Sequence, residues 1–143
     1  MKSEVELFIV EDNANDAELT LRALARAVAH ARVRHLGDGV EVLEALFGEA
    51  VAGSSRLPRV ILLDLKLPRL DGHEVLRRVR ADARTRFIPV VVFTSSSESR
   101  DVAESYRLGA NSYLVKPLGF EEYRQRVADA ARYWIVHNAP PPG

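Results

Sequence analysis

The sequence predicts an α/β fold in which five parallel strands form one doubly wound sheet with helices on both faces. Two observations support this fold class. Short runs rich in Val and Ile alternate along the chain with longer segments of helical periodicity. These runs are apolar at nearly every position, which is typical of parallel strands that helices cover on both sides. Successive β–α units of this kind build a parallel sheet through right-handed crossovers.

Five segments are expected to form the strands of this sheet. In chain order they are residues 5–10, 31–36, 60–63, 88–93 and 112–115. The second is interrupted by arginines and the fifth is only weakly apolar, whereas the other three are rich in Val, Ile and Leu. The strongest runs therefore predict strands that are buried on both faces.

Five helices are expected between and after these strands, at residues 16–29, 40–51, 72–81, 98–108 and 120–137. Either Asp12 or Asn13 caps the first helix, Ser97 caps the fourth, and Gly109 ends it. We interpret residues 1–138 as a single domain. The proline-rich residues 139–143 cannot continue a helix, so they are expected to form an extended tail with no output domain after it.

The composition excludes several classes of function. The 143 residues include 20 basic and 20 acidic side chains, and this formal net charge of zero argues against a nucleic-acid partner. The absence of cysteine excludes disulfides, thiolate nucleophiles and thiolate metal sites. The apolar stretch before Glu11 is too short for a signal peptide or a membrane span. We therefore expect a cytoplasmic protein with no membrane partner.

Polar side chains follow four of the expected strands at the point where each strand ends. In an open parallel sheet, ligands bind outside the carboxyl ends of the strands. Taken alone, each of these residues has an ordinary explanation as a loop acid, a polar loop residue or a surface lysine. Their placement at the same edge of one sheet favours a common site, formed by Glu11, Asp12, Asp64, Thr94 and Lys116.

This set of side chains is suited to phosphoryl transfer. Clustered carboxylates repel one another, so a cation must neutralise them or one must stay protonated. Mg²⁺ suits a site with few carboxylate ligands and several waters. Asp64 would be the nucleophile, and Lys116 would pair with it at rest. The sequence contains no P-loop and no dinucleotide-binding glycine pattern, so a bound nucleotide is not indicated.

The chain resembles the receiver domain of two-component response regulators. Four segments carry the resemblance, namely 10–13 (VEDN), 62–72 (LLDLKLPRLDG), 89–95 (PVVVFTS) and 109–117 (GANSYLVKP). The separation of Asp12 from Asp64 is slightly long for the family, which points to extra residues around 48–59. The resemblance implies a flavodoxin-like fold with the strand order 2-1-3-4-5.

The resemblance also implies the roles of the acids. Asp64 would be the phosphoacceptor, in a reaction that needs Mg²⁺ or Mn²⁺. Asp12 would bind the metal directly, and Glu11 would act mainly through a metal-bound water. The backbone carbonyl of Lys66 would supply a further ligand.

The remaining implied roles concern the phosphorylated state. Lys116 would bind the phosphoryl group, and its peptide bond to Pro117 would be cis, as in the family. Thr94 would move to a phosphoryl oxygen on activation. Tyr113 would rotate inward into the space that Thr94 leaves.

Three further features are the segment 64–68 (DLKLP), the Ser105–Tyr106 pair before residues 109–113, and the Tyr133–Trp134 pair followed by prolines. In these the chain resembles a narrower group, the stand-alone regulators of bacterial phytochrome histidine kinases. Members of that group form symmetric dimers through the last two helices and the last strand. The resemblance therefore implies a phytochrome-type sensor kinase as partner and a homodimer. The residues expected on the dimer or partner face are Tyr106, Tyr113, Tyr123, Tyr133 and Trp134.

The function expected from the sequence is that of a single-domain response regulator that signals by protein–protein contact and is not an enzyme. Two alternatives share the fold, namely a phosphate sink for the kinase and an interaction module that works without phosphorylation. A small-molecule phosphohydrolase is disfavoured, because Lys66 stands where its general acid would be. The complete acid, hydroxyl and lysine set favours the receiver over the phosphorylation-independent module.

Overall fold

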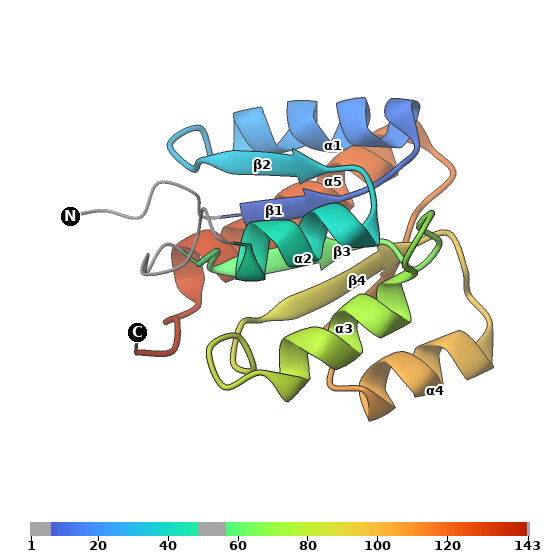
Figure 1. The fold of residues 1–143 in the computed structure, drawn as a ribbon. Helices are drawn as coiled ribbons and strands as arrows, with labels where there is room; N and C mark the ends of the chain where they lie inside the picture. The colour runs from blue at the N-terminus through green and yellow to red at the C-terminus, as the bar shows by residue number, and fades with distance from the viewer. Residues whose placement is uncertain (1–6, 49–56, 143) are drawn as a thin grey trace.

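The computed structural model describes residues 7–48 and 57–142, which form one five-stranded sheet with helices on both faces (Figure 1). All strand pairs are parallel, and the strand order is β2-β1-β3-β4-β5, which confirms the predicted fold class. The strands are β1 (Leu7–Val10), β2 (Val33–Leu36), β3 (Val60–Leu63), β4 (Val90–Thr94) and β5 (Ser112–Val115). The helices are α1 (Ala14–Ala27), α2 (Gly39–Phe47), α3 (Gly72–Ala81), α4 (Ser99–Arg107) and α5 (Phe120–Ala131).

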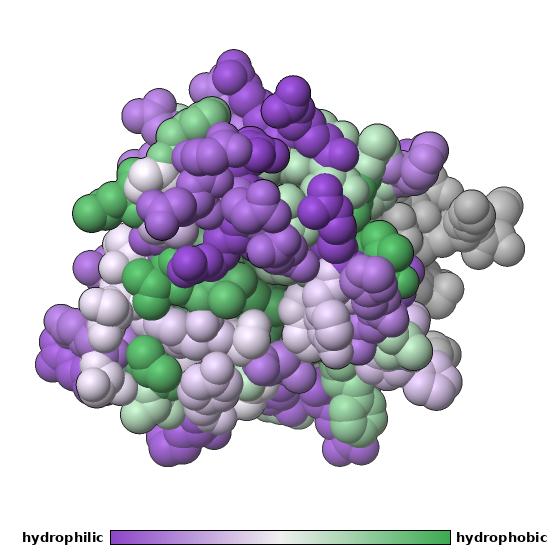
Figure 2. Space-filling model, turned by 180° about the vertical axis from the view of Figure 1, so that it is seen from behind, coloured by the Kyte–Doolittle hydropathy of each residue, from purple (hydrophilic) through white to green (hydrophobic). Residues whose placement is uncertain are grey.

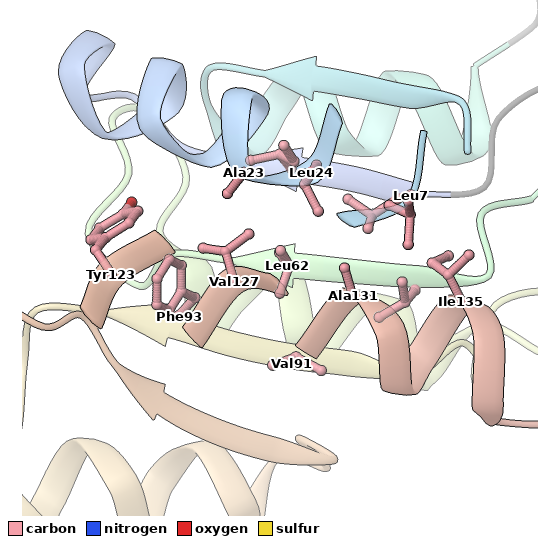
Figure 3. Packing of buried hydrophobic residues seen from close by; sticks show 13 residues of the cluster. Leu7, Ala23, Leu24, Leu62, Val91, Phe93, Tyr123, Val127, Ala131 and Ile135 are labelled. Atoms are coloured by element: carbon pink, nitrogen blue, oxygen red, sulfur yellow. The ribbon is translucent and has the colours of Figure 1, made fainter. Parts of the chain in front are cut away.

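The core consists of two apolar layers, one on each face of the sheet. In β1, Leu7 and Ile9 pack beneath α1 and α5, whereas Phe8 and Val10 pack beneath α2 and α3. Figure 3 shows the first layer, in which side chains of α5 meet those of the central strands. Because side chains alternate between the faces of a strand, a strand covered on both sides has to be apolar at every position. This explains the continuous apolar runs of β1, β3 and β4.

Several element ends differ from the predictions. Helix α2 ends at Phe47, before the predicted end at residue 51, because Gly48 adopts an extended conformation there. Residues 49–56, which include most of the suspected extra segment, lie outside the described residues, as do residues 5 and 6 of the first expected strand. Asn13 caps α1 by accepting a hydrogen bond from Asp16 N (2.9 Å). The prediction that Ser97 caps α4 is wrong, because the residue at the cap position is Glu98. The Glu98 side chain makes no capping hydrogen bond.

The last helix is not a single α-helix over residues 120–137. It changes after Ala131 into a π-helical segment, Arg132–His137, in which Asn138 N donates to Tyr133 O at 2.6 Å. Ile135 packs in the same apolar layer as α5. Residues 139–142 are exposed and have no regular secondary structure.

Arg80 connects the end of α3 to the turn between α4 and β5. Its guanidinium donates to the carbonyls of Gly109 (2.9 Å), Ile88 (2.7 Å) and Arg86 (3.0 Å), and to Asn111 Oδ1 (2.8 Å). Gly109 has a φ of 104°, a conformation that favours glycine, and it follows the end of α4 as predicted. The turn is therefore fixed to its neighbours through backbone carbonyls.

None of the helices in the described part of the chain combines the length and the apolar character that a membrane span needs.

Candidate functional site

The polar residues that follow the strands lie together at one edge of the sheet. Strands β1, β3, β4 and β5 are neighbours in the sheet order, so their carboxyl ends form a continuous row. Backbone hydrogen bonds fix the loops to one another, from Asp64 N to Val10 O (3.1 Å) and from Lys116 N to Thr94 O (2.7 Å). The structure thus brings together the whole set that strand order selects, namely Glu11, Asp12, Asp64, Thr94 and Lys116.

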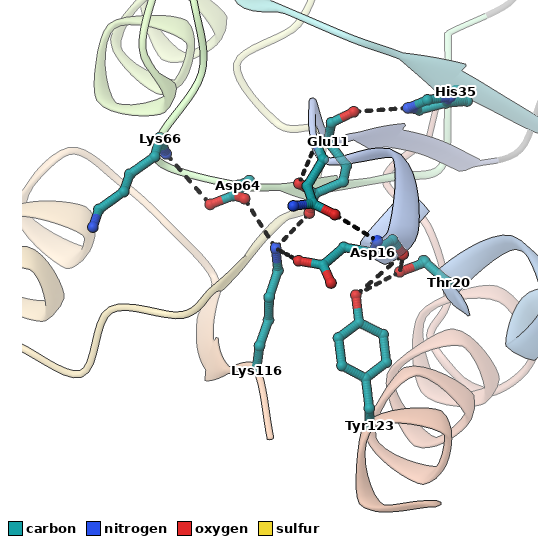
Figure 4. Close-up of polar contacts among 9 residues, drawn as sticks. Glu11, Asp16, Thr20, His35, Asp64, Lys66, Lys116 and Tyr123 are labelled. Carbon is teal, nitrogen blue, oxygen red and sulfur yellow. Dashed lines mark hydrogen bonds and ion pairs between the residues drawn. The ribbon is translucent and has the colours of Figure 1, made fainter. Parts of the chain in front are cut away.

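Lys116 lies at the centre of this cluster and contacts three carboxylates (Figure 4). Its Nζ donates to Glu11 Oε1 (2.5 Å), Asp16 Oδ2 (2.9 Å) and Asp64 Oδ2 (3.0 Å), and its side chain is only 7% exposed. Burial works against the charged ammonium, but the hydrogen bonds with Glu11 and Asp16 and the attraction of Asp64 outweigh it and raise the pKa of Lys116. An ammonium has three N–H donors, and all three are used. The predicted pairing of Lys116 with Asp64 is present.

Asp16 is a site residue that the sequence reasoning missed. It lies in the first turn of α1 rather than at the end of a strand, so a search of strand ends passes over it. The first turn of the helix that follows β1 starts beside the same edge of the sheet. An acid four residues after Asp12, three residues after the cap, is the signal that could have identified it.

The acids form a group with the character of a metal site. One carboxylate oxygen each from Glu11, Asp12 and Asp64 lies within 4.8 Å of the others, and only Asp12 is exposed. Burial raises the pKa of the Glu11 carboxyl to about 7, against the opposing effect of its hydrogen bond with Lys116. Hard carboxylate oxygens are the ligands that Mg²⁺ and Mn²⁺ prefer. The donor set therefore fits such an ion.

The orientation of Asp64 is fixed from both sides. Lys66 N donates to Asp64 Oδ1 at 3.3 Å, while the Lys66 side chain extends away from the carboxylate (Figure 4). Helix α3 begins against the backbone of this loop, and a Cβ added to Gly72 would lie 2.4 Å from Asp64 O. Only glycine allows this close approach. The Asp71–Gly72 pair therefore places a helix start directly beside Asp64.

Thr94 ends β4, and Tyr113 lies in the neighbouring edge strand β5. Thr94 is completely buried (0% exposed), and its Oγ1 has no hydrogen-bond partner within the described part of the chain. Tyr113 is half-buried, and its hydroxyl donates to Ser96 O at 2.9 Å in the loop that follows β4. Thr94 is thus a buried hydroxyl whose hydrogen-bonding capacity is unused among the described residues.

His35 is a second residue that sequence reasoning did not place at the site. Its Nε2 lies 2.7 Å from Glu11 O across the β1–β2 pair. A carbonyl only accepts hydrogen bonds, so this nitrogen carries the proton. His35 therefore fixes the backbone from which the Glu11 carboxylate projects.

Two expectations are wrong. None of the peptide bonds between described residues is cis, so the bond from Lys116 to Pro117 is trans, which is the more stable form of an X–Pro bond. Tyr123 is not part of an exposed face, because it is only 4% exposed, packs edge-on against Phe93 and bonds Thr20 Oγ1 at 2.9 Å. Its position on the inner stripe of α5 gives it the burial of a core residue.

Known proteins resemble this chain in sequence over most of its length. Residues 7–128 match the family described as Response regulator receiver domain. The chain is 42% identical over 135 residues to the probable methanogenesis regulatory protein FilR2 of Methanothrix harundinacea, covering 94% of this chain and 86% of that protein. It is 33% identical over 129 residues to response regulator Rcp1 of Synechocystis, covering 90% of this chain and 88% of that one.

Solved structures resemble the whole chain as well. The phosphorylated cyanobacterial phytochrome response regulator RcpA superimposes with a TM-score of 0.90 at 34% identity, covering 98% of this chain and 100% of that one. The Mn²⁺-bound form of Rcp1 superimposes with a TM-score of 0.88 at 31% identity, covering 96% of this chain and 99% of that one.

Proposed function

Because this chain belongs to the response regulator receiver family, we propose that it accepts a phosphoryl group on Asp64 from a sensor histidine kinase and passes the signal on by protein–protein contact. The observation that carries this proposal is the buried Asp64 carboxylate, held by Lys66 N and Lys116 Nζ beside two further acids. A nucleophilic carboxylate, a lysine and a hydroxyl donor around one point are the parts that phosphoryl transfer requires.

The transfer proceeds by attack of an Asp64 oxygen on the phosphorus of a phosphohistidine. A P–O bond forms, the P–N bond breaks, and the imidazole leaves. The Lys116 ammonium, already bonded to Asp64 Oδ2, compensates the charge on the phosphoryl oxygens. The unpartnered Thr94 hydroxyl donates to one of these oxygens in the product, and Tyr113 adjusts to the new position of Thr94.

Glu11, Asp12 and Asp64 would hold the Mg²⁺ or Mn²⁺ ion that this chemistry uses, with the backbone carbonyl of Lys66 as a further ligand. When bound, the ion neutralises charge on the transferring phosphoryl group. The support for this assignment is the chemistry of the donor set and the likeness to the Mn²⁺-bound form of Rcp1.

The groove between α1 and α5 is suited to the kinase. It has a volume of about 410 Å³, and Leu19, Ala23 and Phe120 supply apolar surface beside Arg22 and Arg26. An amphipathic helix with acidic residues beside its apolar stripe fits this combination. Substituting Phe120→Glu is expected to slow phosphoryl transfer from a phosphorylated kinase while leaving phosphorylation by a small phosphodonor unchanged. Equal slowing with both donors would exclude this docking role.

The kinase is proposed to be of the phytochrome type, supported by the likeness to the phytochrome response regulator RcpA. A phosphorylated phytochrome kinase should transfer its phosphoryl group faster than an unrelated histidine kinase. Equal transfer rates from the two kinases would remove the basis for this partner.

The face formed by α4, β5 and the end of α5 is proposed as the surface for a second copy or a downstream partner. Tyr106 and Tyr133 are 49% and 50% exposed. Tyr113 and Trp134, which the sequence also assigns to this face, are half-buried. Figure 2 shows the side of the molecule that carries α5, where near-white residues, the colour that Tyr and Trp take on this scale, lie below a green apolar band. Tyr133→Arg should shift a dimer towards monomer in analytical ultracentrifugation, and an unchanged distribution would argue against this surface.

The test of the phosphoacceptor is intact mass after incubation with Mg²⁺ and a small acyl phosphate. The wild-type chain should gain one phosphoryl group, and Asp64→Asn should gain none. Removal of Mg²⁺ with a chelator should abolish the gain. An equal gain in Asp64→Asn would contradict the assignment, and no gain in folded wild-type protein would favour an interaction module that works without phosphorylation.

A further inference from the structure

We propose that Asp16 is a positioning residue that holds the Lys116 ammonium in place throughout the phosphorylation cycle, an inference that rests on the proposed function. Asp16 Oδ2 and Lys116 Nζ are 2.9 Å apart, and the lysine side chain is buried. The contact joins the first turn of α1 to the end of β5, which are 100 residues apart in the chain.

Asp16 differs from the other two carboxylates that bind Lys116. Glu11 and Asp64 belong to the acid group whose oxygens lie within 4.8 Å of one another, so both have a second task at the metal. Phosphorylation converts the Asp64 carboxylate into an acyl phosphate, so the oxygen that Lys116 contacts at rest loses its anionic character and becomes a weaker acceptor. Asp16 belongs to neither the metal group nor the reacting atoms. It is the lysine partner that can persist through each step.

The turn that carries Asp16 is itself held firmly. Asp16 N donates to Asn13 Oδ1 (2.9 Å), and Asp16 O accepts from Thr20 Oγ1 (2.8 Å) and Tyr123 OH (3.3 Å). Thr20 and Tyr123 are buried, and their hydroxyl oxygens lie 2.9 Å apart, so the single hydrogen of the Tyr123 hydroxyl is shared between Thr20 Oγ1 and Asp16 O. Figure 4 shows this chain of contacts running from Lys116 through Asp16 to Tyr123 of α5. The carboxylate therefore projects from a rigid support, as a positioning group requires.

The consequence is that Lys116 is ordered before the phosphoryl group arrives. A free lysine side chain has several rotatable bonds and loses conformational freedom when it binds an oxyanion. A lysine already fixed by Asp16 has lost that freedom in advance, which favours the transition state. Asp16 also adds negative charge near an anionic donor, but the ammonium it binds compensates this charge.

The experiment measures the rate of phosphorylation by a small acyl phosphate at saturating Mg²⁺, by intact mass. Asp16→Ala is expected to slow phosphorylation about tenfold through lost orientation of Lys116. Asp16→Glu, which keeps the carboxylate, should restore most of the rate. If Asp16→Ala does not fold, Asp16→Asn takes its place. Glu18→Gln is the matched control, because it removes an exposed acid from the same helix and should leave the rate unchanged.

Two further readouts separate positioning from a purely structural role. In a Lys116→Met background, Asp16→Ala should cause no additional slowing, because its effect passes through the lysine. The dissociation constant for Mg²⁺ should change far less in Asp16→Ala than in Glu11→Gln, since Asp16 lies outside the acid group. A wild-type rate in Asp16→Ala, or equal slowing in both backgrounds, would overturn the inference. Failure of the wild-type chain to accept a phosphoryl group would instead overturn the proposed function and this inference together.

Discussion

Lys116 and Thr94 follow or end neighbouring strands and share a backbone hydrogen bond, yet their side chains differ in how many hydrogen-bond partners they have. Each N–H donor of Lys116 binds a carboxylate, from three different residues. The Thr94 hydroxyl is buried and has no partner among the described residues. The lysine side of the site thus has every donor hydrogen-bonded in the resting chain, whereas the threonine side has a donor without a partner. The lysine side is therefore organised before any group binds, whereas under the proposed function the Thr94 hydroxyl gains its partner from the phosphoryl group.

Removing the lysine should give the largest effect. Lys116→Met is expected to slow phosphorylation by a small acyl phosphate about 100-fold or more, because it removes the group that compensates the phosphoryl charge. The same change should tighten Mg²⁺ binding in calorimetry, because the ammonium no longer occupies Glu11 and Asp64 or repels the ion. Weaker Mg²⁺ binding in this variant would contradict the assigned geometry.

The pH should act on the acid group of the lysine side. The pKa of Glu11 is raised to about 7, so its carboxyl is protonated below that pH and ionised above it. A metal competes with this proton, and the Mg²⁺ dissociation constant should therefore rise about tenfold between pH 8 and pH 6. Calorimetry at the two pH values measures this, and Glu11→Gln should flatten the dependence. An equal dependence in that variant would assign the proton to another group.

The two sides should also differ in stability. Thr94→Val is expected to leave the free energy of unfolding unchanged or to raise it by up to about 1 kcal/mol, because it removes a buried hydroxyl that has no partner. Thr85 is the matched control, since it is equally buried but donates to Val79 O at 2.7 Å. Thr85→Val should lower the free energy of unfolding by about 1 kcal/mol or more in urea titrations. Similar losses in both variants would show that Thr94 has a partner after all.

The smallest effect is expected at Tyr113. Tyr113→Phe removes one half-buried hydrogen bond, to Ser96 O, and should lower the free energy of unfolding by about 0.5–1 kcal/mol. Tyr133→Phe, on an exposed ring, should change nothing in the same urea titration. A larger loss at Tyr113 than at Thr85 would mean that the threonine side is more tightly bonded at rest than the contacts indicate.

Much of the fold could be predicted, because burial on both faces leaves a direct mark on the sequence of β1, β3 and β4. The residues that follow the strands could be predicted as a site, because parallel strands bring their carboxyl ends to one edge of the sheet. Asp16 could not be found in this way, because a helical turn positions it and its partner is 100 residues away. The burial of Tyr123 depends on the rotation of α5 about its axis. Because tyrosine has both an apolar ring and a polar hydroxyl, its presence in the sequence does not show whether it faces the core or the solvent. The π-helical end of the last helix could not be predicted either, because π-helical turns are rare and the residues of this segment carry no pattern that marks one.

The bonds that Arg80 makes to the turn after α4 determine how that helix can move. Its C-terminal end is tied through Gly109 and Asn111 to α3 and the start of β4, whereas its N-terminal end begins at Glu98 without a side-chain cap. A change in the loop around Ser96 cannot make α4 slide along its axis without breaking those ties. Any displacement of α4 that follows a change in this loop is therefore expected to be smaller at Gly109 than at Ser99, where Ser96 contacts Asp101 of the first turn.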